Sequence, residues 1–251
     1  MYKLIKLVFS VLILLVILGF VFWNLPGTCQ FGNCKFKQTI DQVKITTETI
    51  IPKPTTILES GVPDYFLNKT AFIPQAPEKN WDQPWQDTCE EAAILTVKYY
   101  FENKTPDIST LLTDYKVLID KSNSHDINLA QMSQIASDLY NYDSKIIDNP
   151  NTDTIEKYLS RGHILVVPAN GKTLYQENKY FKNGGPLYHN LVILGYDHNK
   201  KQFIVHDVGT QFGAYFKYSY QVLMDSIHDL PPSGDKKEIN QGVPRLLLLL
   251  K

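Results

Sequence analysis

The sequence predicts an α+β domain in which N-terminal helices pack on an antiparallel sheet, preceded by one transmembrane helix. Three observations lead to this prediction. An uncharged apolar run lies near the N-terminus, amphipathic helix patterns follow it, and apolar strand patterns dominate the last third of the chain. Helices that precede strands, rather than alternate with them, are typical of α+β domains.

The composition of the 251 residues fits one folded domain with additional segments. Hydrophobic residues make up 43% and aromatic residues 12%, which is enough for a sizeable core and excludes a wholly disordered chain. The formal net charge of -1 argues against nucleic acid as the main partner, because phosphate binding needs a clustered positive surface. Three cysteines are too few for a scaffold built on disulfides.

Residues 7–23 form the predicted transmembrane helix. The run carries no charge, and as a helix it rises roughly 25 Å, just enough to cross the hydrocarbon core of a bilayer. Lys3 and Lys6 precede it, so the positive-inside rule places the N-terminus in the cytoplasm and everything after Trp23 outside. A cleaved signal peptide and lipidation at Cys29 are the alternatives.

A segment rich in Thr, Lys, Ile and Pro follows the predicted helix and suits a stiff spacer. Cys29 and Cys34 lie at its start and either pair with each other or remain free thiols, which leaves Cys89 as the odd cysteine. The expected segments are a cytoplasmic N-terminus (1–6), a transmembrane anchor (7–23), an extracytoplasmic linker (24–69) and the folded domain (70–251).

Hydrophobic periodicity and capping residues place the regular elements of the folded domain. Helices are expected at residues 89–102, 108–118, 129–140, 154–160 and 220–230. Strands are expected at residues 71–73, 163–169, 189–196, 203–207 and 245–250. Asp87 or Thr88 is the expected N-cap of the first of these helices.

Cys89 opens that first helix and is the candidate nucleophile. A thiol in the first helical turn lies near unpaired backbone N–H groups and the positive end of the helix dipole. Both favour the thiolate, so we expect the pKa of Cys89 to lie below its ordinary value. A small buried structural cysteine is the alternative interpretation.

The segment HNLVILGYDHNKKQFIVHD predicts two strands joined by a polar turn. If the hairpin is centred on His198, His189 and Asp207 lie directly opposite each other on one face of the sheet. A carboxylate in that place can hold an imidazole in one tautomer. A shift of one residue would instead favour His206 or Asn190 as partners.

A Cys–His–Asp set in this chain order suggests nucleophilic catalysis, which also needs a donor for the oxyanion. Gln75, in the segment FIPQAP before the first helix, can supply a side-chain amide beside the backbone N–H of Cys89.

With these motifs the sequence resembles the C39-like family of papain-fold cysteine peptidases. The resemblance rests on FIPQAP, DTCEEAA leading into an apolar helix, YHNLVILGYD and FIVHDVGTQFG, which occur in the family's order over roughly residues 70–225. It implies a papain-like fold and a thiol peptidase. The roles it implies are Cys89 as nucleophile, His189 as general base and acid, Asp207 as orienting carboxylate and Gln75 in the oxyanion hole.

The sequence departs from the family pattern in three places. Glu90 follows the cysteine where many members have Gly, and Val208 follows the aspartate where Pro is usual. Residues 172–187 look like an insertion before the histidine and could form a flap.

No Walker motif, H-E-x-x-H or C-x-x-C occurs, so neither a nucleotide nor a metal or other cofactor is expected. The sequence therefore predicts a membrane-anchored, extracytoplasmic cysteine peptidase that acts on peptides or proteins, with no nucleic acid or nucleotide partner. Two alternatives remain open. One is a cell-wall amidase or transglutaminase-like acyl transferase with the same residue types, and the other is a non-catalytic module that binds peptides or proteins.

Overall fold

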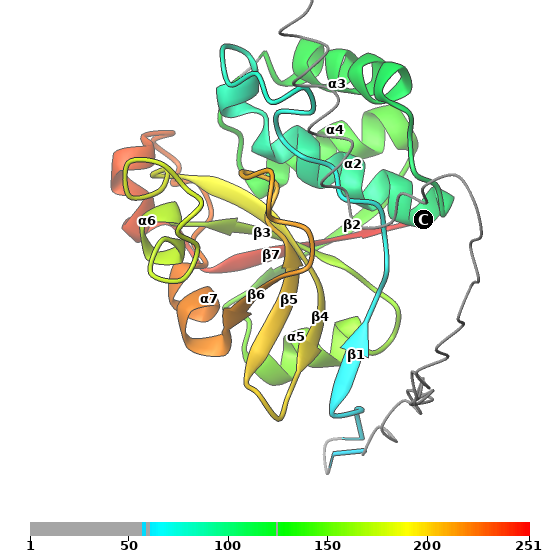
Figure 1. Ribbon diagram of the computed structural model, residues 1–251, viewed down its shortest axis with the longest axis vertical. Coiled ribbons are helices and arrows are strands. Elements are labelled where there is room, and N and C mark those ends of the chain that lie inside the picture. The colour runs from blue at the N-terminus through cyan, green and yellow to red at the C-terminus, as the bar shows by residue number, and fades with distance from the viewer. Residues whose placement is uncertain (1–56, 59–60, 124) are drawn as a thin grey trace, which may run out of the picture. The chain divides into compact units, whose positions relative to one another are not determined.

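The computed structural model describes residues 57–58, 61–123 and 125–251 (Figure 1). The predicted transmembrane helix (7–23) and most of the predicted linker lie outside these residues. Within the described ranges, no helix has both the length and the apolar character needed to cross a membrane.

In the described part of the chain, seven strands form one antiparallel sheet (Figure 1). They are β1 (Tyr65–Leu67), β2 (Asp143–Asp148), β3 (Leu165–Ala169), β4 (His189–Asp197), β5 (Gln202–His206), β6 (Phe216–Ser219) and β7 (Arg245–Leu250). Six of them follow the order β2-β7-β3-β4-β5-β6, and β1 pairs with the end of β4. The predicted antiparallel sheet is thus confirmed.

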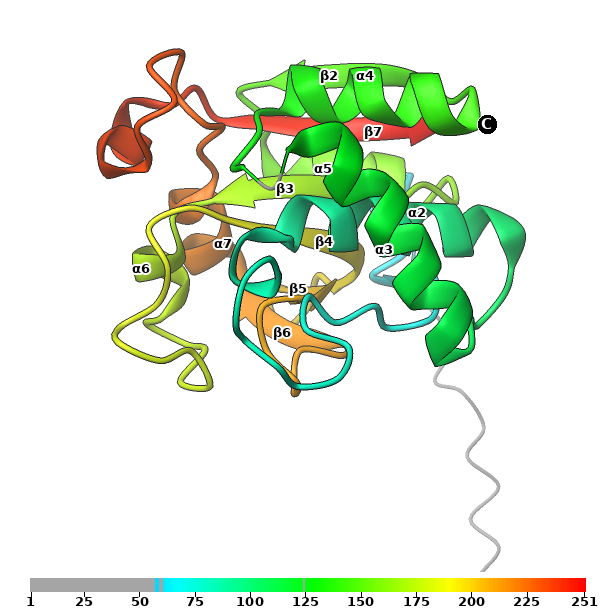
Figure 2. The ribbon, with the colours of Figure 1, turned by 90° about the horizontal axis from the view of Figure 1, so that it is seen from above.

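Helices cover both faces of this sheet (Figures 1 and 2). They are α2 (Cys89–Glu102), α3 (Ile108–Ser122), α4 (Leu129–Tyr140), α5 (Thr152–Leu159), α6 (Gly171–Leu174) and α7 (Tyr220–Ser226), with 3-10 turns at Trp85–Asp87 and Lys236–Gln241. One buried cluster joins α2, α3 and α4 to one face of the sheet, and a second joins α5, α6 and α7 to the other.

Burial on both faces explains the continuous apolar run of β7. Leu247 and Leu249 belong to the core beneath α2, whereas Leu246 and Leu248 belong to the core on the opposite face. Successive side chains of a strand point to opposite faces, so a strand covered on both sides needs apolar residues at consecutive positions. The RLLLLL segment is therefore an inner strand, between β2 and β3.

Most expected elements agree with the structure within a few residues, and those at 89–102, 129–140 and 245–250 have the predicted bounds. The helix expected to reach residue 230 ends at Ser226, because Ile227 has an extended backbone and bridges Ala169 of β3.

Three other differences concern strands. The strand expected at residues 71–73 is wrong, since β1 lies at Tyr65–Leu67, in the segment that the sequence analysis places in the linker. The outermost strands of the order, β2 and β6, were not expected. Their sequences DSKIID and FKYS are short or polar, because an edge strand has less apolar surface to bury.

Candidate active site

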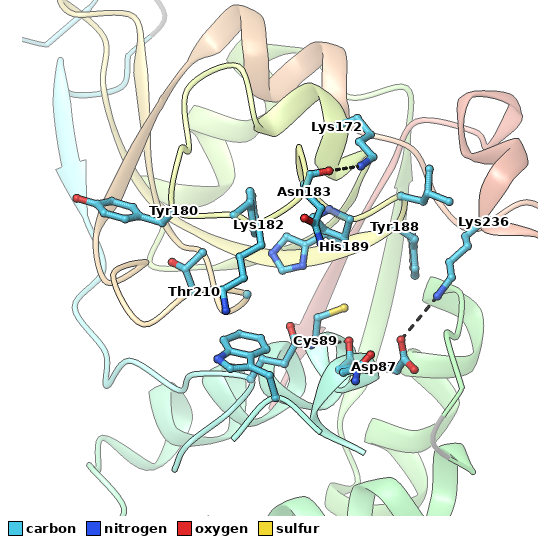
Figure 3. Close-up of a pocket in the computed structure, with 18 of the residues that line it drawn as sticks. Asp87, Cys89, Lys172, Tyr180, Lys182, Asn183, Tyr188, His189, Thr210 and Lys236 are labelled. Atoms are coloured by element: carbon cyan, nitrogen blue, oxygen red, sulfur yellow. Dashed lines mark hydrogen bonds and ion pairs between the residues drawn. The ribbon is translucent and has the colours of Figure 1, made fainter. Parts of the chain in front are cut away.

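A pocket of about 730 Å³ brings together Gln75, Cys89 and His189. Its walls come from the segment leading into α2 on one side and from the loops flanking β4 and β5 on the other. Figure 3 shows Cys89 on one wall and His189 on the opposite wall. The predicted insertion, residues 172–187, supplies part of the second wall.

Cys89 begins α2 as the sequence predicts, and its side chain is only 4% exposed. Thr88 is the N-cap residue, but its side chain makes no capping hydrogen bond. The Thr88 hydroxyl instead donates to the carbonyl oxygen of Gln75 at 3.1 Å. This hydrogen bond connects the start of the helix to the loop segment that contains Gln75.

The thiol of Cys89 donates a hydrogen bond to Oε2 of Glu90 at 3.0 Å. Burial, and then the negative charge of Glu90, raise the pKa of Cys89 well above its usual range. The expectation of a lowered pKa is therefore wrong for this arrangement, since burial and the adjacent carboxyl group outweigh the helix terminus. The structure describes the side chains of Cys89 and His189, and no hydrogen bond joins Sγ of the cysteine to the imidazole of the histidine.

His189 and Asp207 form a buried pair, with Nε2 of the histidine 2.8 Å from Oδ1 of the aspartate. This contact leaves Nδ1 as the ring nitrogen for proton exchange with a thiol or a substrate. Phe181 packs edge-on against the imidazole, with ring centroids 5.3 Å apart. The backbone of Gly209 lies close to the imidazole ring, since a Cβ at this position would lie 2.5 Å from Cε1 of His189.

His189 and Asp207 are in contact, but not through the strand register predicted for the hairpin. The structure pairs Val192 with His206, so Asp207 follows the paired region and does not lie directly opposite His189. The difference arises at the turn, since Asp197 pairs with Gln202 and the hairpin is therefore centred between Asn199 and Lys200 instead of at His198. The register shift between Ile193 and Gly195 then changes the pairing back by one residue. Asp207 is a diagonal neighbour of His189, and such neighbours are within reach of longer side chains.

Asp207 has two further partners that the sequence analysis did not identify. Its Oδ2 accepts hydrogen bonds from the Tyr218 hydroxyl at 2.5 Å and from Nδ2 of Asn178 at 2.8 Å. Burial opposes ionisation, but the imidazole of His189 and these hydrogen bonds lower the pKa of Asp207 below its usual value. No spacing signal marks either residue, since Tyr218 lies in the unexpected strand β6 and Asn178 in the insertion.

Gln75 lines the pocket, but its amide serves the adjacent loop in this structure. Its Nε2 donates to the carbonyl oxygens of Trp85 at 2.8 Å and Gln86 at 2.9 Å, which uses both N–H groups. Its backbone N–H donates to the carbonyl of Val208, the residue after Asp207.

The alternative partners of the predicted hairpin have other roles. His206 is fully buried, and its ring packs edge-on between Phe72 and Tyr215, with centroids 5.2 and 4.7 Å away. Burial lowers the pKa of His206 to about 4, so this side chain is neutral near pH 7. Asn190 places its Nδ2 4.0 Å from Sγ of Cys89. Among the described residues, no group of three or more His, Cys, Asp or Glu side chains is arranged to hold a metal ion.

Residues 69–226 match the model of the Peptidase_C39 like family. No curated protein is significantly similar to the chain. Among solved structures, one described as a C39-like peptidase from Bacillus anthracis shares 12% identity with a TM-score of 0.34. The match covers 51% of this chain and 60% of that one.

Replacing Tyr218 with Phe is expected to lower the free energy of unfolding by about 1.5–3 kcal/mol at neutral pH, because a hydrogen bond to a buried charge is lost. A carboxylate whose folded pKa is lowered stabilises the fold above its unfolded pKa of about 3.9, and this stability is lost as the pH falls through the folded pKa. The difference between wild type and Tyr218→Phe should therefore shrink in acid.

Urea unfolding at several pH values measures this difference, with Tyr180→Phe as a control at an exposed tyrosine. A loss of stability in Tyr218→Phe that stayed constant as the pH fell through the folded pKa of Asp207 would show that the hydroxyl acts independently of the charge on Asp207.

Proposed function

This chain belongs to the Peptidase_C39 like family, and we propose that it hydrolyses peptide bonds as a cysteine peptidase with Cys89 as the nucleophile. The observation that carries the proposal is the buried pair of His189 and Asp207, 2.8 Å apart, in the pocket that also contains Cys89. A nucleophile beside an imidazole that a carboxylate orients is the arrangement used for acyl transfer on several unrelated folds.

In the proposed mechanism, Nδ1 of His189 takes the thiol proton, and the thiolate of Cys89 attacks the carbonyl carbon of the substrate. Asp207 fixes the tautomer that carries hydrogen on Nε2 and stabilises the imidazolium that forms. His189 then protonates the leaving amine, and water releases the acyl group from the sulfur.

The oxyanion formed by the attack needs hydrogen-bond donors. The backbone N–H of Cys89, at the start of α2, is one candidate, and the side-chain amide of Gln75 is the other. Because both N–H groups of Gln75 bind carbonyl oxygens in this structure, the amide has to exchange one of these bonds for the oxyanion.

Two alternatives use the same residues. A non-catalytic peptide-binding module is favoured by one observation, the hydrogen bond of the Cys89 thiol to Glu90 in place of His189. A cell-wall amidase or transglutaminase-like acyl transferase needs the same three groups. Digestion of peptide libraries in parallel with peptidoglycan separates these enzymes from a peptidase.

Substitution of Asp207 by Asn is expected to lower kcat by about 10²–10⁴-fold, because an amide can donate to the imidazole and favour the wrong tautomer. His206→Asn should change kcat by less than about threefold, because its ring packs among aromatic side chains outside the pocket. Cleavage of a peptide library by the full-length protein measures both, and Cys89→Ala should be inactive.

The comparison of Asp207→Asn with His206→Asn also tests whether Asp207 is the third member of the triad. Activity lost in His206→Asn and retained in Asp207→Asn would move the triad by one residue. Undiminished cleavage by Cys89→Ala would remove the proposed nucleophile.

The rim of the pocket favours substrates with a large apolar side chain. Tyr180 and Phe212 line the pocket, and their rings contact each other at a tilt of 36°, with centroids 4.8 Å apart. They are 57% and 67% exposed, far more than core aromatics, and Trp81 lines the same pocket. Exposed aromatic surface beside a site is typical of ligand contact.

Truncation of either Tyr180 or Phe212 to Ala should raise KM about tenfold for library peptides with an aromatic residue, and leave kcat for small-residue peptides unchanged. Competition assays with the two peptide sets check this. Tyr65→Ala is the control, since Tyr65 is also exposed (45%) but lies on β1 and outside the pocket. An equal loss of cleavage efficiency for the aromatic and the small-residue peptides would contradict a subsite on the rim of the pocket.

The uncharged run at residues 7–23 supports a further part of the proposal, a peptidase anchored in the cell membrane with its domain outside. Protease added to intact cells should then remove residues 70–251 and spare the anchor, while a cytoplasmic marker protein stays intact. A domain that remains protected under these conditions would reverse the orientation.

A further inference from the structure

The Cys89 thiol contacts a carboxyl group that the proposed mechanism does not use. Glu90 has no exposed surface, and its two oxygens have different partners. Oε2 accepts the thiol hydrogen bond at 3.0 Å, and Oε1 accepts the backbone N–H of Ile127 at 3.1 Å. Glu90 is therefore fixed at one end by the backbone and contacts the reacting sulfur at the other.

The charged groups around Glu90 are acidic. Glu91 neighbours it on α2, and Asp126 approaches from the connection between α3 and α4. The phenol of Tyr188 faces it from the segment before β4. From β4, the neutral side chain of Asn190 approaches the sulfur of Cys89. None of the described lysines, arginines or histidines forms an ion pair with Glu90.

Lys236, the cation that pairs with the neighbouring Asp126, is also engaged by a second carboxylate. Lys236 pairs with Asp126 at 2.8 Å and with Asp87 at 3.6 Å, so its charge is shared between them. Burial, and then the charges of Glu91 and Asp126, raise the pKa of Glu90 well above its usual range. This carboxyl group consequently changes its charge at a higher pH than an exposed glutamate does.

The charge of Glu90 decides which form of Cys89 is stable. As a carboxylate, Glu90 accepts the S–H group, and a thiolate at the same distance would place two negative charges together in a buried site. As a carboxylic acid, Glu90 can donate its own proton to the sulfur, and a donor to the charged form favours the thiolate.

We propose that Glu90 is a proton-operated restraint on the nucleophile, an inference that rests on the proposed peptidase function. A proton from solvent neutralises the carboxylate of Glu90, and the thiol proton of Cys89 passes to Nδ1 of His189. The products are a thiolate that accepts a hydrogen bond from Glu90 and an imidazolium held by Asp207. Loss of the proton from Glu90 returns the thiol to its present hydrogen bond, so the enzyme is active in acid and restrained at higher pH.

Alkylation of Cys89 by iodoacetamide tests this without any substrate. The full-length protein is treated over a series of pH values, and peptide mass spectrometry separates labelling of Cys89 from that of Cys29 and Cys34. In the wild type, the rate at Cys89 should fall as Glu90 ionises and rise again in alkali, where the thiol ionises unaided. A rate that only rises with pH would overturn the proposal with no variant needed.

Glu90→Gln keeps the shape of the side chain but cannot ionise. Its Cys89 should react at least about tenfold faster than the wild type near pH 7.5, equivalent to a pKa lower by one or more, and without the intermediate fall. Glu91→Gln is the matched control, because Glu91 is a buried neighbour whose carboxyl group accepts from Ser122 and not from the sulfur. This control should retain the fall, displaced to lower pH because the charge of Glu91 no longer raises the pKa of Glu90. Circular dichroism verifies that both variants are folded.

The result separates this proposal from the proposed function. Equal rates in Glu90→Gln and the wild type, with peptide cleavage intact, would overturn the restraint and leave the peptidase. The expected alkylation profiles without cleavage of any peptide would support the restraint on Cys89 and overturn the peptidase.

Discussion

The buried carboxylate of Asp207 sets the arrangement of the second wall of the pocket. An unpaired charge in a protein interior costs several kcal/mol, so both of its oxygens need donors. Oδ1 lies 2.8 Å from Nε2 of His189 and accepts the N–H of Gly209 at 3.3 Å, while Oδ2 accepts from Tyr218 and Asn178. These donors come from β4, the loop after β5, β6 and the insertion. One charge thus requires four separate segments of the chain to meet.

The chain near Asp207 also joins the two walls. Its backbone N–H donates to the carbonyl of Gly213, and a Cβ on that glycine would lie 1.7 Å from the carbonyl oxygen of Asp207. The next residue, Val208, accepts the N–H of Gln75, whose carbonyl accepts the hydroxyl of Thr88 at the start of α2. The residues that position the imidazole are therefore connected to those that position the thiol by one backbone hydrogen bond and one hydrogen bond from the Thr88 side chain.

The sequence supports prediction where local patterns determine the structure. The helix beginning at Cys89 follows from periodicity, and β7 follows from its apolar run, because both are set by burial against the core. The hairpin register does not follow from the polar turn, since Asp197 pairs with Gln202 and the turn is not centred on His198. A bulge between Ile193 and Gly195 then changes the register by one residue. An isolated glycine in a strand pattern is the available signal for such a bulge. At Gly195 a Cβ would lie 2.2 Å from the carbonyl oxygen of Phe66, so the glycine allows β1 to pair.

The site residues that no local pattern indicates are those defined by contacts distant in sequence. Tyr218 lies on an edge strand, Asn178 lies in an apparent insertion, and both contact the site through Asp207. The same limitation explains the wrong expectation for the pKa of Cys89. A helix terminus is visible in the sequence, but the depth of burial and the approach of Asp126 are properties of the assembled fold.

Asp207 and Glu90 show that burial alone does not decide the charge of a carboxyl group. Both are fully buried, and for both the largest effect of the surroundings is to oppose ionisation. Donors from His189, Tyr218 and Asn178 reverse this effect at Asp207 and keep it ionised. At Glu90 the acidic neighbours add to it, so the pKa values of the two groups move in opposite directions. The stable charge contacts the imidazole, and the changeable one contacts the sulfur, which is the arrangement that the proposed base and the proposed pH-dependent nucleophile require.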